Sequence, residues 1–309
     1  MGSLRNPAAW NQIYGMRPTW GLIPVSLSSS ELFLHQLATN GPMARNPHDL
    51  EMLLNAMARP EPDPRNPFSV GLGVGLAGDT NPETALRDPI RVGWLGDLNG
   101  YLPTDPELLS HARDAVVQKM TKKTSSSSSR IIVDENVSIP FTDFPSLWTA
   151  WCTLRSWANV QVINSIGATE SDRHTRMGPQ INFEYDNGIG LGAHDITRAS
   201  IARTKWWKAL VQLFAQYDFL ILPSTQCFPF PVEWKWPHEV AGKHMDTYHQ
   251  WMEGSLYASI VGIPAMSVPV GFAGGSPSKP VGVQVLTAKG CDAKLIAFAK
   301  KIHAVLRWE

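Results

Sequence analysis

The first ten residues read MGSLRNPAAW, and the chain continues to residue 24 as NQIYGMRPTWGLIP. In this stretch Ser3 follows Gly2, and Arg5 stands two positions later. A serine hydroxyl becomes a nucleophile when a base takes its proton, and a neighbouring glycine lets backbone N–H groups approach a reacting carbonyl. A Gly-Ser pair alone is equally typical of a solvated terminus. The prolines and glycines predict that residues 1–24 form a loop.

The composition favours a globular protein that does not bind nucleic acid. Of the 309 residues 43% are hydrophobic, which is enough for a substantial core, and the formal net charge of zero gives no basic face for phosphate. The three cysteines, Cys152, Cys227 and Cys291, are widely spaced, so they indicate a reducing compartment and fit no metal spacing. We find no signal-peptide pattern and no apolar run long enough for a membrane span. These features predict a cytoplasmic, soluble protein.

Strand and helix patterns alternate along the chain. Short apolar runs predict strands at residues 91–96, 131–133, 219–223, 265–272 and 281–286. Helical spacing and capping residues predict helices at 46–57, 105–120, 246–261 and 292–306, capped by Asn46, Asp105 and Asp246 in the first three, and through most of 144–217. Strands separated by helices indicate an α/β fold with a mixed central sheet flanked by helices on both faces. Apolar stripes that include Leu147, Trp151, Leu210 and Leu213 indicate core packing.

Two segments are not expected to contribute to the core. Residues 121–130 contain five consecutive serines and predict an exposed surface loop. Residues 59–89 are dense in proline and glycine, and the Gly-x-Gly-x-x-Gly pattern at 73–78 lies within them. That pattern binds a dinucleotide only between a strand and a helix, which the sequence does not predict here, so we reject it.

The opening stretch resembles the core motif of the amidase signature family. Residues 2–9 (GSLRNPAA) and 15–21 (GMRPTWG) match the family pattern Gly-Gly-Ser-[Ile/Leu]-Arg-x-Pro-Ala followed by Gly-[Leu/Met]-[Lys/Arg]-Pro-Thr-x-Gly, with Met1 at the first glycine. Residues 217–224 (YDFLILPS), 239–252 (EVAGKHMDTYHQWM), 262–272 and 280–284 extend the resemblance in order to about residue 288. It implies an amidase signature domain over residues 1–309 that lacks its N-terminal part.

This resemblance also implies a mechanism. It places the nucleophile that forms the acyl-enzyme at Ser3 and part of the oxyanion turn at Gly2, and it makes Arg5 a residue that orders the loop. The family's lysine base and second serine lie upstream of the motif, and the Gly-Ser-Ser-Gly-Gly-like stretch that carries the second serine does not occur in the 309 residues. The family needs no cofactor, and we expect no metal site, because His244 and His249 are five residues apart rather than four.

Pocket residues and an alternative base are less well defined. By resemblance Tyr248 and Trp251 form a wall of the acyl pocket, with Cys227 and Phe228 as weaker candidates, although packing against the sheet explains them equally well. A histidine with a carboxylate partner could replace the lysine. Nothing in the spacing distinguishes among the candidate histidines or the candidate carboxylates. These are His174, His194, His244 and His249, with Asp195 or Asp246 as the partner.

The expected function is hydrolysis of a non-peptide carboxylic amide, with a small-molecule amide as substrate. Two alternatives remain open at this stage. The chain could be a non-catalytic amidase remnant, or it could be a subunit that forms a homo-oligomer or binds a separate chain carrying the missing half, because unpaired strand edges recruit partners.

Overall fold

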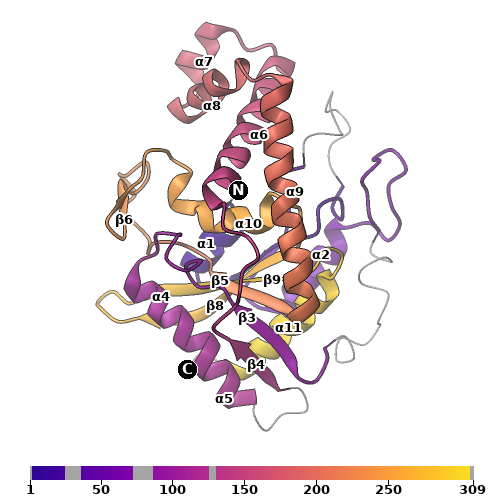
Figure 1. Ribbon diagram of the computed structural model, residues 1–309, viewed down its shortest axis with the longest axis vertical. Helices are drawn as coiled ribbons and strands as arrows, with labels where there is room; N and C mark the ends of the chain where they lie inside the picture. The colour runs from indigo at the N-terminus through magenta and orange to yellow at the C-terminus, as the bar shows by residue number, and fades with distance from the viewer. Residues whose placement is uncertain (1, 25–35, 72–85, 125–129, 307–309) are drawn as a thin grey trace.

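The computed structural model describes residues 2–24, 36–71, 86–124 and 130–306. Seven strands form one sheet in the order β2-β1-β8-β9-β5-β3-β4 (Figure 1). Their bounds are β1 Tyr14–Arg17, β2 Met43–Ala44, β3 Ile90–Trp94, β4 Ile131–Asp134, β5 Phe219–Pro223, β8 Ala265–Ala273 and β9 Lys279–Leu286. Strands β5, β3 and β4 run parallel, whereas the other neighbours are antiparallel. The predicted mixed α/β sheet is confirmed.

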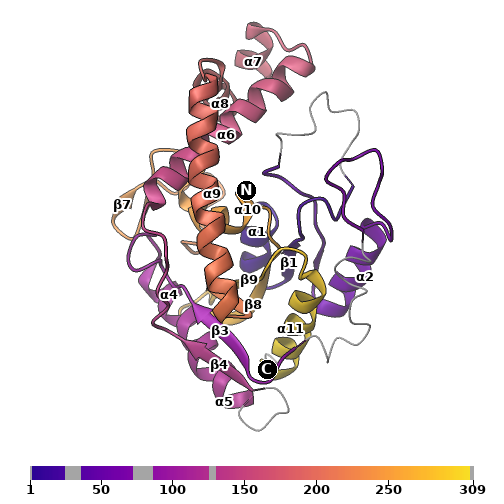
Figure 2. The same cartoon turned by 45° about the vertical axis from the view of Figure 1, so that its right-hand side comes forward.

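Helices cover both faces of this sheet (Figure 2). The helical segments are α1 Arg5–Trp10, α2 Pro47–Met57, α4 Pro106–Arg113, the π-helix η1 Asp114–Met120, α5 Thr121–Thr124, α6 Phe144–Ser165, α7 Glu170–Arg176, α8 Pro179–Ile189, α9 Ala193–Gln216, the 3-10 helix η2 Gln250–Ser255, α10 Leu256–Ser259 and α11 Asp292–Val305. In β5, Phe219 and Ile221 pack into the core with α2, α4 and α11, whereas Leu220 and Leu222 pack into the core with α6, α9 and α10. This alternation follows from the two-residue period of a strand.

Two predicted caps are formed as expected. The Asn46 side chain accepts a hydrogen bond of 2.9 Å from the backbone N–H of Asp49, and Pro47 opens helix α2. Asp105 accepts bonds from the first backbone N–H groups of α4. Each side chain satisfies N–H groups that have no partner inside the helix.

Helices α6 and α9 form a long arm that carries α7 and α8 at the end away from the sheet (Figures 1 and 2). At the base of the arm Trp206 is fully buried, and its indole N–H donates to the backbone oxygen of Tyr257 at 2.8 Å. Four members of the predicted apolar stripes are buried as expected: Leu147, Trp151, Leu210 and Leu213. The same helical spacing predicts that Ile201 belongs to the stripe of Leu210 and Leu213, but Ile201 is 51% exposed.

The predicted loop at residues 1–24 is wrong, because this stretch contains α1 and β1. Pro7 lies in the first turn of α1, where a helix does not use the proline nitrogen. Gly15 of β1 pairs with Ser267 of β8, and this long-range pairing stabilises the strand. The loop predicted at 121–130 is also wrong at its start, since Thr121–Thr124 is helix α5. Residues 125–129 and the pattern at 73–78 lie outside the described residues.

The helix predicted at residues 246–261 is confirmed only over residues 250–259, which form η2 and α10, and its predicted start is wrong. Its first part is preceded by a hairpin of β6 (Glu239–Val240) and β7 (Lys243–His244), whose turn places Ala241 and Gly242 at positive φ. Asp246 caps no helix, and its own N–H donates to the Gln250 side chain at 2.9 Å. The helical chain begins only with η2, which is irregular at Met252.

Truncating Trp206 should reduce stability strongly. We expect Trp206→Ala to lower the free energy of unfolding by about 3–5 kcal/mol, because it leaves a cavity in the core. Trp206→Phe should cost less but still leave the Tyr257 carbonyl oxygen unpaired. Urea unfolding measures both changes, provided that the m-value is the same in the variants and the wild type. Trp234→Ala is the matched control, because Trp234 is 49% exposed, and an equal loss in this control would contradict the assignment.

Candidate active site

The signature residues form a tight turn that leads into α1. The backbone N–H of Asn6 donates to the Gly2 oxygen at 2.9 Å. A Cβ atom at Gly2 would lie 2.5 Å from Nδ2 of Asn6, so no larger residue fits there without displacing that side chain. Ser3 lies exposed on the turn, whereas Gly2 and Asn6 are buried. The turn therefore presents the Ser3 hydroxyl outward and holds the backbone beneath it.

Arg5 ties this turn to the rest of the molecule. Its guanidinium is 1% exposed. It donates to Gln284 Oε1 at 2.6 Å, to the Ser255 backbone oxygen at 2.7 Å and to Ser259 Oγ at 2.7 Å. Burial and the like charge of Arg17 lower the pKa of Arg5 to about 9, which leaves the group charged at neutral pH. One side chain thus joins α1 to β9, η2 and α10.

Gln284 is held in turn by the neighbouring backbone. Its Nε2 donates to the Gly254 oxygen at 2.8 Å and to the Pro223 oxygen at 3.1 Å, so its Oε1 faces Arg5. Gln226 supports the same segment, because its Oε1 accepts from the Gly254 N–H at 3.1 Å. Sequence reasoning missed both glutamines as site residues. The available signal was a polar residue within an apolar strand run, which must find buried partners.

No general base contacts Ser3 within the described part of the chain, where its side chain makes no hydrogen bond. Of the histidines considered, His174 and His244 are exposed at the surface near Glu170 and Asp246, and His194 is exposed as well. Only His249 is buried, and its Nε2 lies 3.1 Å from Oε1 of Glu184. The structure therefore brings none of the candidate bases to the Ser3 hydroxyl.

His249 belongs to a buried polar cluster between the arm and the sheet. Arg155 pairs with Glu184 at 2.5 Å, and Asn159 also donates to that carboxylate. Burial and the positive charge of Arg155 lower the pKa of His249 to about 3. This pKa keeps the ring mainly neutral at pH 7, although the Glu184 carboxylate, 3.1 Å from Nε2, favours the charged form. A cavity of about 410 Å³ adjoins this cluster, and its walls include Trp148, Trp151 and Cys152.

Three of the four predicted pocket residues lie together. Trp251 stacks on Trp10, the last residue of α1, with ring centroids 5.3 Å apart and planes 8° apart. The Trp10 indole donates to the Cys227 oxygen at 3.2 Å, and Tyr248 lies 6.4 Å from Trp251. Tyr248 also lines a pocket of about 220 Å³ with Phe183 and Trp236. Phe228 lies apart, against the Lys279 ammonium.

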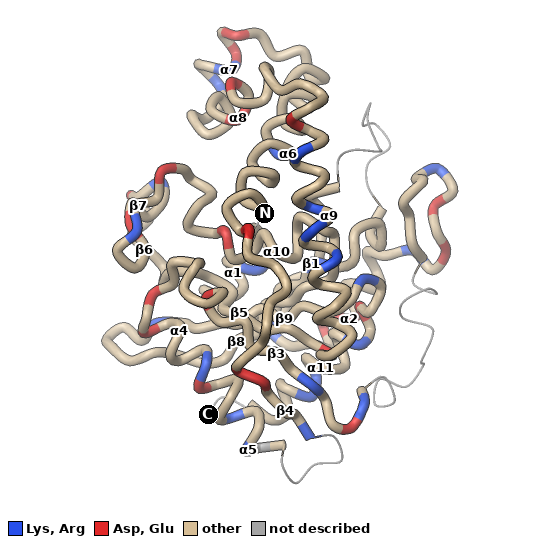
Figure 3. Tube along the Cα trace, viewed as in Figure 1, with Lys and Arg blue, Asp and Glu red and all other residues tan. Residues whose placement is uncertain are grey.

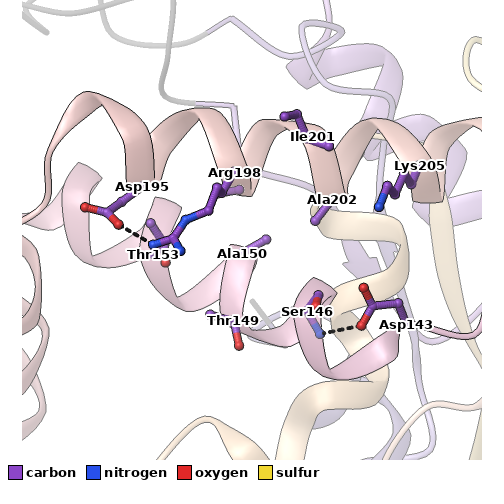
Figure 4. A pocket seen from close by; sticks show the side chains of 11 residues that line it. Asp143, Ser146, Thr149, Ala150, Thr153, Asp195, Arg198, Ile201, Ala202 and Lys205 are labelled. Carbon is purple, nitrogen blue, oxygen red and sulfur yellow. Dashed lines mark hydrogen bonds and ion pairs between the residues drawn. The ribbon is translucent and has the colours of Figure 1, made fainter.

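A further cavity of about 380 Å³ lies between α6 and α9, away from the signature turn (Figure 4). Figure 4 shows Arg198 paired with Asp195, at 2.6 Å, and Lys205 farther along the same helix.

Within the described ranges no three His, Cys, Asp or Glu side chains gather closely enough to hold a metal ion. Burial raises the pKa of the Cys152 and Cys227 thiols to about 12, so neither is a nucleophile at neutral pH. Among the described helices, none is both long and apolar enough to cross a membrane.

The neutral state of His249 predicts a pH dependence of stability. An unfolded histidine titrates at about 6.5, so below that pH the unfolded chain binds a proton that the folded chain does not. The free energy of unfolding should therefore fall as pH falls from about 6.5 towards 3, by at most about 1.4 kcal/mol per pH unit. Urea unfolding at pH 7 and pH 5 should show a smaller loss in His249→Gln than in the wild type. His174→Gln is the control. If His249→Gln loses as much stability between pH 7 and pH 5 as the wild type does, the assignment is contradicted.

Comparison with known proteins gives matches along nearly the whole chain. The family described as Amidase matches residues 1–296. A glutamyl-tRNA(Gln) amidotransferase subunit from Saccharolobus solfataricus is 25% identical over 98% of this chain and 62% of its own length. An acylamidase from Rhodococcus erythropolis is 25% identical over 99% of this chain and 60% of its own length. The chain thus spans about three-fifths of the length of these curated relatives.

Solved structures show the same fold. A bacterial aryl acylamidase of the amidase signature family superimposes with a TM-score of 0.81 at 20% identity, over 99% of this chain and 61% of that one. The 6-aminohexanoate cyclic dimer hydrolase complexed with substrate gives a TM-score of 0.77 at 20% identity, over 99% of this chain and 63% of that one. With the family match over residues 1–296 and the predicted mixed sheet in place, this chain belongs to the amidase signature family.

Proposed function

We propose that this chain carries the nucleophile of an amidase-type hydrolase that cleaves a small non-peptide carboxylic amide. Ser3 Oγ attacks the amide carbonyl carbon, and the C–N bond breaks to release the amine or ammonia. Water then hydrolyses the serine ester to release the acid and regenerate Ser3. No cofactor takes part in this sequence of steps.

The observation that carries this proposal is the geometry of the signature turn. Gly2 is packed where a Cβ would clash, Ser3 faces outward, and Arg5 is anchored by three hydrogen bonds to distant elements. A hydrolase needs its nucleophile held rigidly near backbone donors, and an anchored turn supplies that rigidity. We assign Gly2 to the oxyanion turn and Arg5 to ordering the loop.

We assign the aromatic group formed by Trp10, Trp251, Tyr248 and Cys227 to the wall of the acyl pocket. It is supported by the stacking of Trp251 on the last residue of α1, which starts two residues after Ser3. A flat apolar wall close to the nucleophile suits an apolar or aromatic acyl group. Phe228 has no part in this wall, because it packs against Lys279.

A role as one chain of a complex is the second candidate, and one observation favours it. The edge strand β4 exposes half of the Ile132 side chain, and unpaired strand edges recruit partner chains. Relatives named as amidotransferase subunits are consistent with assembly. In this alternative the partner chain supplies the lysine and second serine that the resemblance implies, and Ser3 gains its base only in the complex.

A serine-directed fluorophosphonate probe tests the proposed nucleophile. The 309-residue chain alone should resist labelling, because no described group takes the Ser3 proton, and loss of a catalytic partner costs on the order of a million-fold in turnover. The same chain joined to, or mixed with, a segment that carries the lysine and second serine should be labelled at Ser3. Mass spectrometry of the labelled peptide reads the site.

Two variants complete that experiment. Ser3→Ala should abolish labelling and amide turnover in the complemented form, whereas Ser146→Ala, on the first turn of α6, should leave both unchanged. If the complemented wild type and Ser3→Ala are labelled alike, Ser3 is not the nucleophile. If the wild type alone turns over amide and Ser3→Ala does not, a base within these 309 residues replaces the lysine.

The anchoring role of Arg5 predicts a loss of stability. Arg5→Lys keeps the charge but cannot reach Gln284, Ser255 and Ser259 together, so the free energy of unfolding should fall by about 2–3 kcal/mol. Arg176→Lys is the matched control, because Arg176 is 78% exposed and pairs with Asp172 at the surface, where such pairs contribute about 0–1 kcal/mol. Urea unfolding measures the stability of both variants. If Arg5→Lys loses no more stability than the control, Arg5 does not anchor the turn.

A further inference from the structure

Arg17, the last residue of β1, is a buried cation with two guanidinium donors, Nε and Nη2, that lack acceptors among the described residues. Its side chain is 4% exposed, and Nη1 donates to the Leu37 oxygen at 2.9 Å. Its Nε and Nη2 atoms are buried, and neither has a hydrogen-bond partner in the described chain. These two atoms form one edge of the guanidinium, with two parallel N–H groups that match the two oxygens of a carboxylate. Leaving such donors unsatisfied is costly, so the edge calls for an acceptor.

A neighbouring side chain supplies one more unpaired donor. The Trp20 indole nitrogen is buried without a partner among the described residues. Gly262 lies between the two side chains, because a Cβ there would be 3.1 Å from the Trp20 Cβ and 3.9 Å from Arg17 Nη2. Arginine and tryptophan side chains donate hydrogen bonds and accept none. A group that fills the Arg17 edge must therefore be an acceptor.

The surrounding charge favours an anion. The like charge of Arg203 on α9, together with burial, lowers the pKa of Arg17 to about 10. Asp292 is the nearby acid, but both of its oxygens already accept from Thr19, from the backbone N–H at 2.8 Å and from the hydroxyl at 2.5 Å. Figure 3 shows basic segments on α9 and beside β1. Arg17 and Arg203 together thus carry more positive charge than the Asp292 carboxylate balances.

The same chain shows how such an edge is filled. In Arg65, Nε and Nη2 donate to the two carboxylate oxygens of Asp63, each at 2.9 Å. In this bidentate pair Arg65 is 64% exposed, whereas Asp63 is buried. Arg17 presents the same two atoms in a buried setting, where a charged hydrogen bond is worth more.

We propose that the buried Nε–Nη2 edge of Arg17, beside Gly262 and the Trp20 side chain, is a binding site for a carboxylate group. The carboxylate is borne by a free small acid or by an acidic side chain of a second copy of this chain. The site does not include Ser3, and its test does not require hydrolase activity.

Thermal unfolding in sodium acetate tests the free-acid source. At equal ionic strength set with sodium chloride, the wild type should show a rise of a few degrees in Tm as acetate increases to about 100 mM. Arg17→Gln should show no rise. Arg65→Gln is the matched control and should respond like the wild type, because the Arg65 edge is already filled. An equal response in Arg17→Gln, or a response to phosphate at lower concentration than to acetate, would overturn the carboxylate site.

Protein concentration tests the second source. If a second copy supplies the carboxylate, Tm without acetate should rise between about 10 and 100 µM wild type and stay constant in Arg17→Gln. Failure of the wild type to respond to both acetate and concentration would overturn the proposal. If Arg17→Gln does not fold, Arg17→Lys replaces it, because lysine keeps the charge and lacks the two-donor edge. In the wild type, acetate should then shift one arginine Nε–H resonance that is missing from the Arg17→Lys spectrum, and no shift would overturn the site.

Discussion

The buried guanidinium of Arg5 is the interaction on which the arrangement of the site depends. A charge removed from water must have its donors satisfied, and Arg5 finds only neutral acceptors, on β9, η2 and α10. Those acceptors are themselves fixed, because the Gln284 amide donates to the Gly254 and Pro223 oxygens. The turn at Ser3 is therefore positioned by residues more than 200 places away in the sequence, and any change in these hydrogen bonds moves Ser3.

The fold was predictable wherever local pattern and burial agree. Strand β5 and the capped helices α2 and α4 appear as predicted, since a buried apolar run and a side-chain cap each act within a few residues. Helix α1 and the β6–β7 hairpin were missed. Six residues are too few for a helix to be stable alone, so α1 depends on β1, β8 and β9 rather than on its own sequence. The helix predicted from Asp246 begins four residues later, at Gln250, because the residues before it follow the hairpin.

The site was predictable in part, and the missing part is informative. Motif spacing placed Ser3, Gly2 and Arg5 on one turn, but it could not identify Gln284 as the partner of Arg5. A polar residue in a strand shows that a partner exists without showing which residue it is. Trp251 presents the opposite case. Its aromatic character was evident from the sequence, yet only the structure shows that it stacks on Trp10. If Trp251 also forms the proposed pocket wall, substituting it alters packing and pocket together.

Arg5 and Arg17 lie twelve residues apart and show two outcomes of burying the same group. The guanidinium of Arg5 is surrounded by acceptors, so its burial stabilises the turn and lowers its pKa without removing its charge. Arg17 is equally buried, but burial and the like charge of Arg203 lower its pKa, and its Nε–Nη2 edge has no partner among the described residues. Like charges at close range in a poorly solvated interior oppose folding. A carboxylate at Arg17 would relieve both its own unpaired donors and the repulsion that Arg5 experiences. The stability of the signature turn is therefore coupled to the occupancy of a site on the neighbouring strand.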